Sequence, residues 1–549
     1  MISPYWRSEE KLGAWVLLIA AFMFNMGIIY CMVLMNSWSG RFYDAIQNLD
    51  KVKFIEMALQ FFLIVTLLIS IHLSKYFTQA TLAFKWRIWL TQQVMNEWLH
   101  NSTFCRLFIY KTKTENPDQR ISQDLATFTT SSLFLIITII AETIKSVIFA
   151  IILWKLSTTF LIPLPGGDEL HIPGYMLWIT IIYVTFSTGI IYKFGKPLVA
   201  LDYTQEKVEA DFRFGLMRIR DRREEVSLLD GAKAEIKFLG QNILNIIKNY
   251  KQIIRCNMYI ISFQNLFVNF STLLPVLAAS PMFFSGAITL GTLQQVVNAF
   301  NRVEGALMTF STSFQDFASW LATFERIVDF RAEMKQINEI SQEKNSELNL
   351  NISNANHILE VTDLTLFLPE KKTLSKFNFK IAPQEKVLMM GRSGLGKSTL
   401  LKCIAGYWPY ASGQIIRPHA LTIVAQKPYF PISTLHDSLL YPNLELNVSE
   451  LEIKRVLEEC SLGDLSNRIY EVNDWNAILS VGEQQRLNFA RIILAKPSWL
   501  VLDEPTSAID KALEKKLFAA LFTELPAVSL LTIGHSLSLK DFHTRCIEV

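Results

Sequence analysis

Cysteine and charge are scarce in this sequence of 549 residues, and several recognisable patterns are missing from it. The 6 cysteines are scattered without paired spacing, so neither a disulfide framework nor a metal site is indicated, and a reduced, cytosolic face suits them. The net charge is only +3, and no basic-aromatic pattern accompanies it, so nothing indicates binding to nucleic acid. No internal repeat stands out either. The chemistry must therefore be found in the apolar runs and in short local motifs.

The first part of the chain is strongly apolar. Hydrophobic residues make up 50% of the sequence, with 38 Phe and only 19% charged residues, which indicates membrane spans joined to a globular domain. A bilayer core needs about 20 apolar residues per helix. The sequence predicts six spans, over residues 12–35, 55–80, 131–156, 174–194, 258–282 and 285–310. Any single run could be a buried core helix, but six in series favour a membrane domain. The first run has no small-residue cleavage site, so we interpret it as a retained span rather than a signal peptide.

Basic residues are distributed unevenly between the predicted spans. Segments 85–120 and 193–255 are rich in Lys and Arg, whereas the turn-rich segment 157–173 has neither. The positive-inside bias places the two basic segments and both termini in the cytoplasm, although the basic residues in segment 36–54 fit this less well. Segments 75–100 and 202–237 are expected to continue as helices below the bilayer.

Two opposite charges lie in the middle of the third predicted span. Charges at that depth cost roughly 2.5–3.5 kcal/mol each, so they normally face a polar cavity or each other. Glu142 and Lys145 are three residues apart, which places them on one helical face. They can pair, line a cargo path, or do both.

A polar stretch separates two kinds of sequence. Apolar density falls over residues 331–357, which predicts a linker rather than a structured core. Residues 1–330 are then the membrane domain, and residues 358–549 form an α/β domain with strands near 359–361 and 386–390.

A phosphate-binding loop follows the second of these strands. Glycines let backbone N–H groups approach phosphate oxygens, and the next helix adds its positive end. We expect Lys397 to neutralise the β- and γ-phosphates and the Ser398 hydroxyl to hold Mg²⁺. The other predicted ATP contacts in this stretch are Gly391, Ser393, Gly394, Gly396 and Thr399.

A second motif lies about a hundred residues downstream, where Leu479-Ser480-Val481-Gly482-Glu483-Gln484 precedes Leu500-Val501-Leu502-Asp503-Glu504-Pro505. The apolar run after Trp499 predicts a buried parallel strand that brings Asp503 to the metal and Glu504 to the attacking water. Each residue alone is uninformative. A carboxylate pair after an apolar strand, with a phosphate loop upstream, predicts ATP hydrolysis.

These motifs resemble those of the ATP-binding-cassette (ABC) family. The resemblance implies that Gln426 links metal, water and membrane domain, that His535 contacts the γ-phosphate, and that Asp510 is a dimer contact. It also implies that Ser480, Gly482 and Glu483 complete the ATP site of the other subunit, with Glu483 in place of the commoner Gln. Where an aromatic residue often stacks on adenine, the sequence has Leu368 with Phe367 beside it. ATP and Mg²⁺ are thus the implied cofactors, with Ser398, Gln426 and Asp503 on the metal.

The membrane half resembles the type-2 ABC transmembrane region, which the bacterial SbmA/BacA peptide-uptake family and the peroxisomal subfamily D transporters share. The resemblance rests on Lys85-Trp86-Arg87-Ile88-Trp89-Leu90, Asn116-Pro117-Asp118-Gln119-Arg120-Ile121 and Glu209-Ala210-Asp211-Phe212-Arg213. It implies six transmembrane helices of the type IV, exporter-like fold, fused to an α/β P-loop domain.

One membrane half and one ATPase half per chain imply a homodimeric half-transporter in the lipid bilayer. The implied activity is ATP-driven transport across a bacterial inner membrane, with uptake of peptides, cobalamin or other small hydrophilic solutes. Because no longer organelle-targeting segment precedes the first span, a bacterial membrane is favoured over a peroxisomal one. Export, fatty-acyl transport and an ATP-gated channel or regulator remain alternatives.

Overall fold

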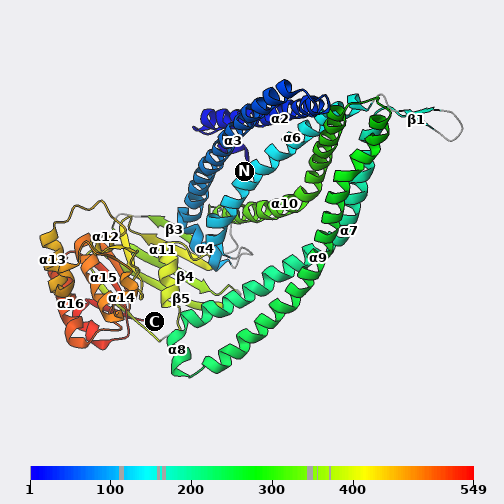
Figure 1. Ribbon diagram of the computed structural model, residues 1–549. Helices are drawn as coiled ribbons and strands as arrows, with labels where there is room; N and C mark the ends of the chain where they lie inside the picture. Colours follow the sequence, from blue (N-terminus) through cyan, green and yellow to red (C-terminus); the bar gives the residue numbers. More distant parts are fainter. Residues whose placement is uncertain are drawn as a thin grey trace. The chain divides into compact units, whose positions relative to one another are not determined.

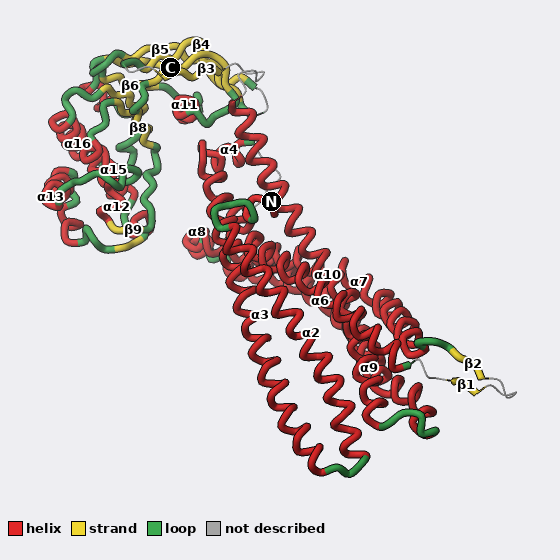
Figure 2. The backbone as a smooth tube through the Cα atoms, turned by 90° about the horizontal axis from the view of Figure 1, so that it is seen from above, coloured by secondary structure: helices red, strands yellow, loops and turns green. Residues whose placement is uncertain are grey.

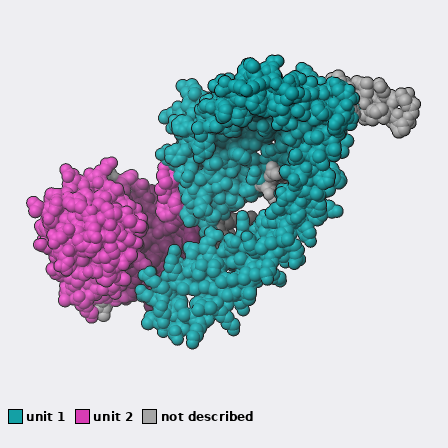
Figure 3. Space-filling view, in the orientation of Figure 1, with its two compact units in different colours: residues 1–94, 116–329 teal, residues 95–115, 330–549 magenta. Residues whose placement is uncertain are grey.

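The computed structural model describes residues 2–110, 116–157, 161–163, 169–342, 350–354, 357–369, 372–392 and 394–549. The chain divides into two compact units (Figure 3). Unit 1 comprises residues 1–94 and 116–329, and unit 2 comprises residues 95–115 and 330–549. Unit 2 therefore includes a short segment, 95–115, that lies in the apolar half of the sequence.

Long helices build unit 1, and two of them, α3 and α10, continue into unit 2 (Figures 1 and 2). The long helices are α2 (Lys11–Gln47), α3 (Lys51–Leu99), α6 (Leu125–Leu156), α7 (Tyr175–Asp221), α9 (Ala232–Phe284) and α10 (Leu290–Gln342). The short elements are α1 (Ile2–Tyr5), α5 (Pro117–Gln119), the π-helical turn η2 (Arg120–Asp124), α8 (Arg223–Leu228) and the antiparallel strands β1 (Leu161–Pro163) and β2 (Glu169–His171). All the long elements of the predicted membrane half are thus helices, as the sequence predicts.

Five described helices are long and apolar enough to cross a membrane, judged by length and composition. They are Lys11–Gln47, Lys51–Ile109, Pro117–Leu156, Tyr175–Asp221 and Ala232–Phe284, and they contain five of the six predicted spans. The sixth predicted span, 285–310, falls mostly in α10, which does not reach that apolar level among the described residues. Polar side chains such as Gln294, Asn298 and Arg302 lower the apolar content of its first turns.

Helices α7 and α9 form an antiparallel hairpin joined by α8 (Figure 1). The Asn249 side chain of α9 donates hydrogen bonds to Leu201 O at 2.9 Å and Gln205 Oε1 at 3.0 Å on α7. The continuous helix predicted over 202–237 is therefore wrong. The chain reverses between Arg222 and Gly231, because the charged run supplies no apolar face that would favour continuing straight.

Helices α2, α3 and α10 are held together by side-chain contacts to backbone. Trp38 Nε1 of α2 donates to Met57 O of α3 at 2.7 Å, and the two helices run side by side in Figure 2. Asp44 and Gln47 of α2 accept hydrogen bonds from the first backbone N–H groups of α10, at 2.9 and 2.7 Å. These acceptors satisfy groups that a helix start leaves unpaired.

The charges in the third predicted span pair with each other. Lys145 and Glu142 form an ion pair along α6, and both side chains are largely buried. Pairing is one of the outcomes that their spacing predicts. A second ion cluster lies where η2 meets α6, with Asp124 bonded to Arg120 at 2.8 Å and to Arg326 of α10 at 3.0 Å.

Unit 2 is an α/β unit with two sheets. The five-stranded parallel sheet has the order β13-β6-β12-β11-β8, and the four-stranded mixed sheet has the order β3-β7-β4-β5. The strands are β3 (Leu350–Asn354), β4 (Leu359–Phe367), β5 (Thr373–Ile381), β6 (Lys386–Met390), β7 (Ala411–Arg417), β8 (Leu421–Val424), β11 (Trp499–Asp503), β12 (Ser529–Ile533) and β13 (Arg545–Glu548), with β9 (Ser433–Thr434) paired to β10 (Val472–Asn473).

Helices cover the parallel sheet and complete unit 2. They are α11 (Lys397–Ala405), α12 (Leu435–Leu440), α13 (Glu450–Glu459), α14 (Trp475–Ile478), α15 (Val481–Ala495) and α16 (Lys511–Glu524), with η3 (Gly463–Asn467) and η4 (Leu537–Phe542). Segment 95–115 adds η1 (His100–Ser102) and α4 (Thr103–Ile109). The predicted strands at 359–361 and 386–390 are confirmed, and the middle of β6 is fully buried.

The polar stretch at 331–357 is more ordered than its composition indicates. Helix α10 continues to Gln342, and β3 joins the four-stranded sheet through β7, while residues 343–349 and 355–356 lie outside the described residues. The apolar residues Phe330, Met334 and Ile337 are buried and share one helical face. Because charged and polar residues lie between these three, average polarity gave no sign of this helix.

Candidate functional site

The loop between β6 and α11 adopts the backbone expected of a phosphate loop. Gly394 and Gly396 have φ values of +84° and +83°, a region that favours glycine. A Cβ on Gly396 would approach Leu374 Cδ2 to 2.6 Å, and one on Gly391 would approach Val549 O to 2.6 Å. Backbone angle therefore favours glycine at 394, lack of space favours it at 391, and both favour it at 396. The predicted contact Ser393 lies outside the described residues.

Lys397 opens α11 and its ammonium group turns back over the loop. Its Nζ donates to Gly391 O at 2.6 Å and to Arg392 O at 3.0 Å, and lies 3.2 Å from His535 Nε2. Burial of Lys397 keeps this positive charge fixed beside the loop amides. A fixed ammonium next to backbone N–H groups is suited to phosphate oxygens. Thr399 follows within α11 and is half-buried.

Ser398 and Asp503 bring oxygen atoms together at the edge of the parallel sheet. β11 is buried along its whole length and ends at Asp503, which is 7% exposed. Burial raises the pKa of Asp503, and a hydrogen bond from the Ser398 hydroxyl acts in the opposite direction. A hydroxyl and a buried carboxylate are ligands that Mg²⁺ prefers, so this donor set fits the predicted metal.

The Glu504 carboxylate lies between two of the predicted residues. Gln426 Nε2 donates to Glu504 Oε2 at 2.8 Å, and His535 Nε2 lies 3.2 Å from Glu504 Oε1. The backbone of Glu504 has a φ of +43°, unusual for a non-glycine residue, which turns the chain sharply at the end of β11. His535 thus links Lys397 and Glu504, and four residues predicted from separate motifs meet in one place.

The segment predicted to complete a partner's site starts α15. Ser480 and Glu483 form a capping box, in which Ser480 N and Oγ donate to Glu483 Oε2 at 2.9 and 2.7 Å. These hydrogen bonds lower the pKa of Glu483. The carboxylate of Glu483 therefore stabilises the helix start, a role that motif reading did not identify. A Cβ on Gly482 would meet Ala508 O at 3.1 Å, so the chain passes close by there.

Asp510 and Gln485 fix the segment after Glu504. Asp510 caps α16 by accepting from Ala512 N and Leu513 N, both at 3.0 Å. Gln485 of α15 is buried, donates to Ser507 Oγ at 2.9 Å and accepts from Ala508 N at 3.0 Å. The contribution of Gln485 was missed, because its partners lie more than twenty residues away in the sequence.

Glu514 is a second residue that sequence reasoning missed. It is 3% exposed, and its two carboxylate oxygens accept from Thr506 Oγ1 at 2.6 Å and from the Ser538 hydroxyl. Thr506 follows Glu504 by two residues, and Ser538 follows His535 by three. Glu514 therefore ties together the two loops that present these side chains. Its helical spacing with Leu517, on the buried face of α16, was the available signal.

Segment 95–115 contacts the helix that follows the phosphate loop. Arg106 Nη2 of α4 donates to Gly406 O at 3.0 Å, where α11 ends, and the rings of Tyr110 and Tyr410 lie 6.0 Å apart. At the same edge, Phe367 N donates to Tyr410 O at 2.9 Å, and Leu368 is partly exposed beside it. A piece of the apolar half thus reaches the end of α11.

Comparison with known proteins gives two family matches. Residues 1–284 match the model of the ABC transporter transmembrane region 2, and residues 374–507 match the ABC transporter model. An uncharacterized ABC transporter ATP-binding protein of Haemophilus influenzae is 31% identical over 98% of this chain and 89% of its own length. The inner membrane ABC transporter ATP-binding protein YddA of Escherichia coli is 28% identical over 97% of this chain and 94% of its own length. The structure of a bacterial Atm1-family ABC exporter with ATP bound superposes with a TM-score of 0.68 at 16% identity, covering 100% of this chain and 94% of that one.

Proposed function

Because the chain belongs to the ABC transporter family that carries transmembrane region 2, we propose that two copies of it form an importer of small hydrophilic or peptide-like solutes. ATP-driven transport by a half-transporter follows from the family itself. One observation gives the strongest support to the proposed roles in ATP hydrolysis. Contacts of 2.8–3.2 Å connect Lys397, Gln426, Glu504 and His535.

The proposed chemistry assigns one task to each group. Lys397 would neutralise the β- and γ-phosphates, and the loop amides would hold their oxygens. Ser398, Asp503 and Gln426 would hold Mg²⁺, which supplies positive charge to the phosphate oxygens when bound. Glu504 would accept the proton of the attacking water. Its left-handed backbone and its contacts with Gln426 and His535 hold the carboxylate where it can do so.

We place the second half of each ATP site on a partner copy. The start of α15 is exposed, with Val481 58% accessible, and Ser480 makes its hydrogen bonds to Glu483. This exposed segment is available to cover the phosphate loop of another chain. In this proposal Ser480, Gly482 and Asp510 of one copy face Lys397 of the other. ATP binding would then favour a closed state of the pair, and hydrolysis would release it.

We further propose a multi-pass protein of a bacterial inner membrane with the ATPase domain in the cytoplasm. The membrane domain would span residues 1–330, with a connection at 331–357 and the ATPase domain at 358–549. The name of the Escherichia coli relative as an inner membrane protein supports the membrane, and the basic segments 85–120 and 193–255 support the orientation.

Transport by the purified protein in sealed vesicles tests this function. Vesicles with ATP inside should accumulate a labelled tripeptide or cobalamin above its outside concentration, and Glu504→Gln vesicles should not. Solute that equilibrates without accumulating would indicate a gated channel and contradict the proposal. Accumulation only when ATP is on the same side as the solute would indicate export and contradict the proposed direction.

A further inference from the structure

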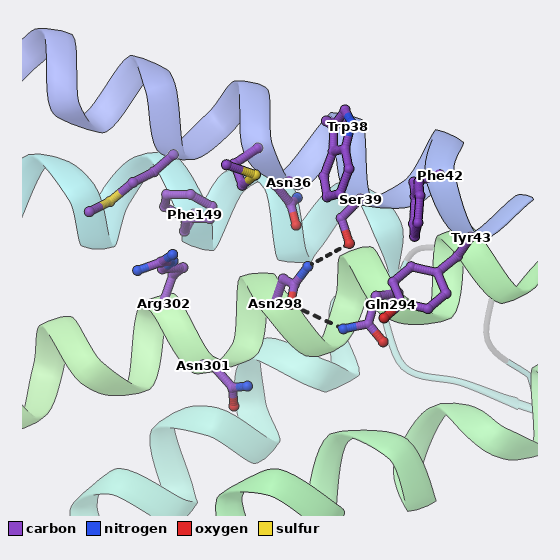
Figure 4. Close-up of a pocket in the computed structure, with 12 residues that line it drawn as sticks. Asn36, Trp38, Ser39, Phe42, Tyr43, Phe149, Gln294, Asn298, Asn301 and Arg302 are labelled. Atoms are coloured by element: carbon purple, nitrogen blue, oxygen red, sulfur yellow. Dashed lines mark hydrogen bonds between the residues drawn. The ribbon is translucent and has the colours of Figure 1, made fainter. Parts of the chain in front are cut away.

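A cavity of about 390 Å³ lies within unit 1, between α2, α6 and α10 (Figure 4). Amide side chains dominate its polar wall, contributed by Asn36, Gln294, Asn298 and Asn301. Arg302 is the one charged residue among the described lining residues, and none of those residues is acidic. The cavity therefore offers hydrogen bonds and one positive charge.

Asn36 has an unused hydrogen-bond acceptor in this wall. It is 6% exposed, and its Oδ1 has no partner in the described structure. Asn298 differs, because it donates to Ser39 Oγ at 3.1 Å and accepts from Gln294 Nε2 at 3.2 Å. In Figure 4 the Asn36 side chain points from α2 toward α10. A buried acceptor without a partner is destabilising, so its retention at a cavity wall points to a ligand that donates a hydrogen bond.

Arg302 also has no counter-charge among the residues that the structure describes. It lies in the predicted sixth span and forms no ion pair with any residue that the structure describes. Charged side chains within a membrane segment are costly and normally face a partner or a polar cavity. Glu142 and Lys145 of α6 form an ion pair with each other. Arg302 instead extends from α10 toward Phe149 at the cavity (Figure 4).

We propose that this cavity binds the carboxylate end of a small, amide-bearing solute. This inference rests on the transport function proposed above. The Arg302 guanidinium would bind the carboxylate, and Asn36 Oδ1 would accept an amide N–H from the same solute. The cavity volume lies within the range of small-molecule sites, about 300–1,000 Å³. A solute of this class has the chemistry of a short peptide with a free C-terminus.

Binding without ATP tests the proposal separately from hydrolysis. The full-length protein in phosphatidylcholine nanodiscs is titrated with a tritiated N-acetyl tripeptide and with its C-terminal amide. The free acid should bind at least about tenfold more tightly, because hydrogen bonds between charged groups are the stronger kind. Equal binding of acid and amide, or no binding of either, would overturn the proposal.

Three variants locate the binding. Arg302→Gln should abolish the preference for the acid, whereas Arg41→Gln removes an exposed cation of α2 outside the cavity and should leave that preference unchanged. Asn36→Leu should weaken binding of both peptides and yet raise or preserve the thermal stability, because it removes an unpaired buried acceptor. A purely structural Asn36 predicts the reverse, lower stability with unchanged binding, and that result would count against the site.

Two further arms distinguish peptide binding from lipid binding and from a failure of the ATPase. If phosphatidylglycerol in the nanodiscs displaces the peptide in wild type, Arg302 is a lipid-phosphate site and the proposal fails. ATP hydrolysis is measured on the same preparations. A preparation that hydrolyses ATP, and loses this activity through Glu504→Gln, but binds no acid contradicts the cavity inference alone and leaves the ATPase assignment standing.

Discussion

At the scale of single residues, the candidate site depends on how two neighbouring carboxylates are placed. Asp503 is buried and bonded to Ser398, while Glu504 turns outward to Gln426 and His535. The sequence predicted an apolar strand leading into both residues, and β11 does end at Asp503. These different surroundings suit Asp503 to binding Mg²⁺ and Glu504 to activating water, and a separate variant tests each proposed role.

Glu504→Gln is expected to reduce ATP hydrolysis by about 10²–10⁴-fold, the typical contribution of a general base. The amide keeps the shape of the side chain, so ATP should still bind. Hydrolysis is measured by phosphate release and binding by a fluorescent nucleotide. Glu445→Gln, an exposed carboxylate of the same unit, is the control and should hydrolyse ATP normally. A Glu504→Gln protein with near wild-type turnover would show that another group activates the water.

Asp503→Asn should stabilise the nucleotide-free protein at pH 7 while removing its stabilisation by Mg²⁺ and ATP. Burial raises the pKa of Asp503 in the folded protein above its value in the unfolded chain. Asp503 therefore stabilises the fold at a pH below its unfolded pKa, and this stabilisation is lost as the pH rises through its folded pKa. Asparagine carries no charge to bury, yet it can still accept from Ser398. Thermal unfolding from pH 4 to pH 8, with and without Mg²⁺ and ATP, measures both effects. A lower unfolding temperature of the variant at pH 7 without nucleotide would contradict the assigned cause.

At the scale of elements, β6, β11 and β12 run parallel and bring Lys397, Asp503 and His535 to one edge of the sheet. The sequence predicted β6 and β11 because their apolar runs are local and lead directly into motifs. It did not predict the contacts of Gln485 or Glu514, because both depend on partners from other elements. The helix over 331–342 was also missed, since charged and polar residues together outnumber its apolar residues.

Glu514→Leu should lower ATP turnover about tenfold or more without a matching change in ATP affinity. The expected size follows from hydrogen bonds to charged groups, which contribute about 1.5–3 kcal/mol. The variant leaves Thr506 and Ser538 without their shared acceptor, so the loops that carry Glu504 and His535 lose their tie. Turnover and nucleotide binding are measured side by side.

The double variant Glu514→Leu with Thr506→Val is the control for folding. Removing both partners of the hydrogen bond should recover part of the lost thermal stability, because no buried hydroxyl then lacks its acceptor at that position. Turnover should stay low. Turnover that recovers together with stability would show that Glu514 acts only on folding.

At the scale of the whole molecule, a short piece of the apolar half belongs to the ATPase unit. Segment 95–115 falls in unit 2, and Arg106 of α4 bonds to the end of α11. The sequence predicted a helix over 75–100, and α3 confirms the helix to Leu99, while its place below the bilayer stays a prediction. Which residue of this region meets the ATPase unit could not be predicted, because Arg106 and Gly406 are 300 residues apart.

Arg106→Ala should lower solute accumulation several-fold in the vesicle assay while changing ATP hydrolysis much less. The guanidinium bonds to the helix that directly follows the phosphate loop, so its loss should weaken the link between that helix and α4. Arg87→Ala, which removes an exposed cation of α3, is the matched control. Equal loss of accumulation and hydrolysis would instead indicate damage to the ATPase unit.

We propose that two copies of this chain share two ATP sites, and a tandem-linked dimer distinguishes this arrangement from one complete site per chain. With Ser480→Arg in one half and Lys397→Ala in the other, the shared arrangement leaves one site intact. With both substitutions in the same half, it leaves none. Shared sites therefore predict ATP hydrolysis by the first dimer and none above background by the second. The opposite pattern, in which only the second dimer hydrolyses ATP, would show that each chain contains a complete site of its own and would contradict shared sites.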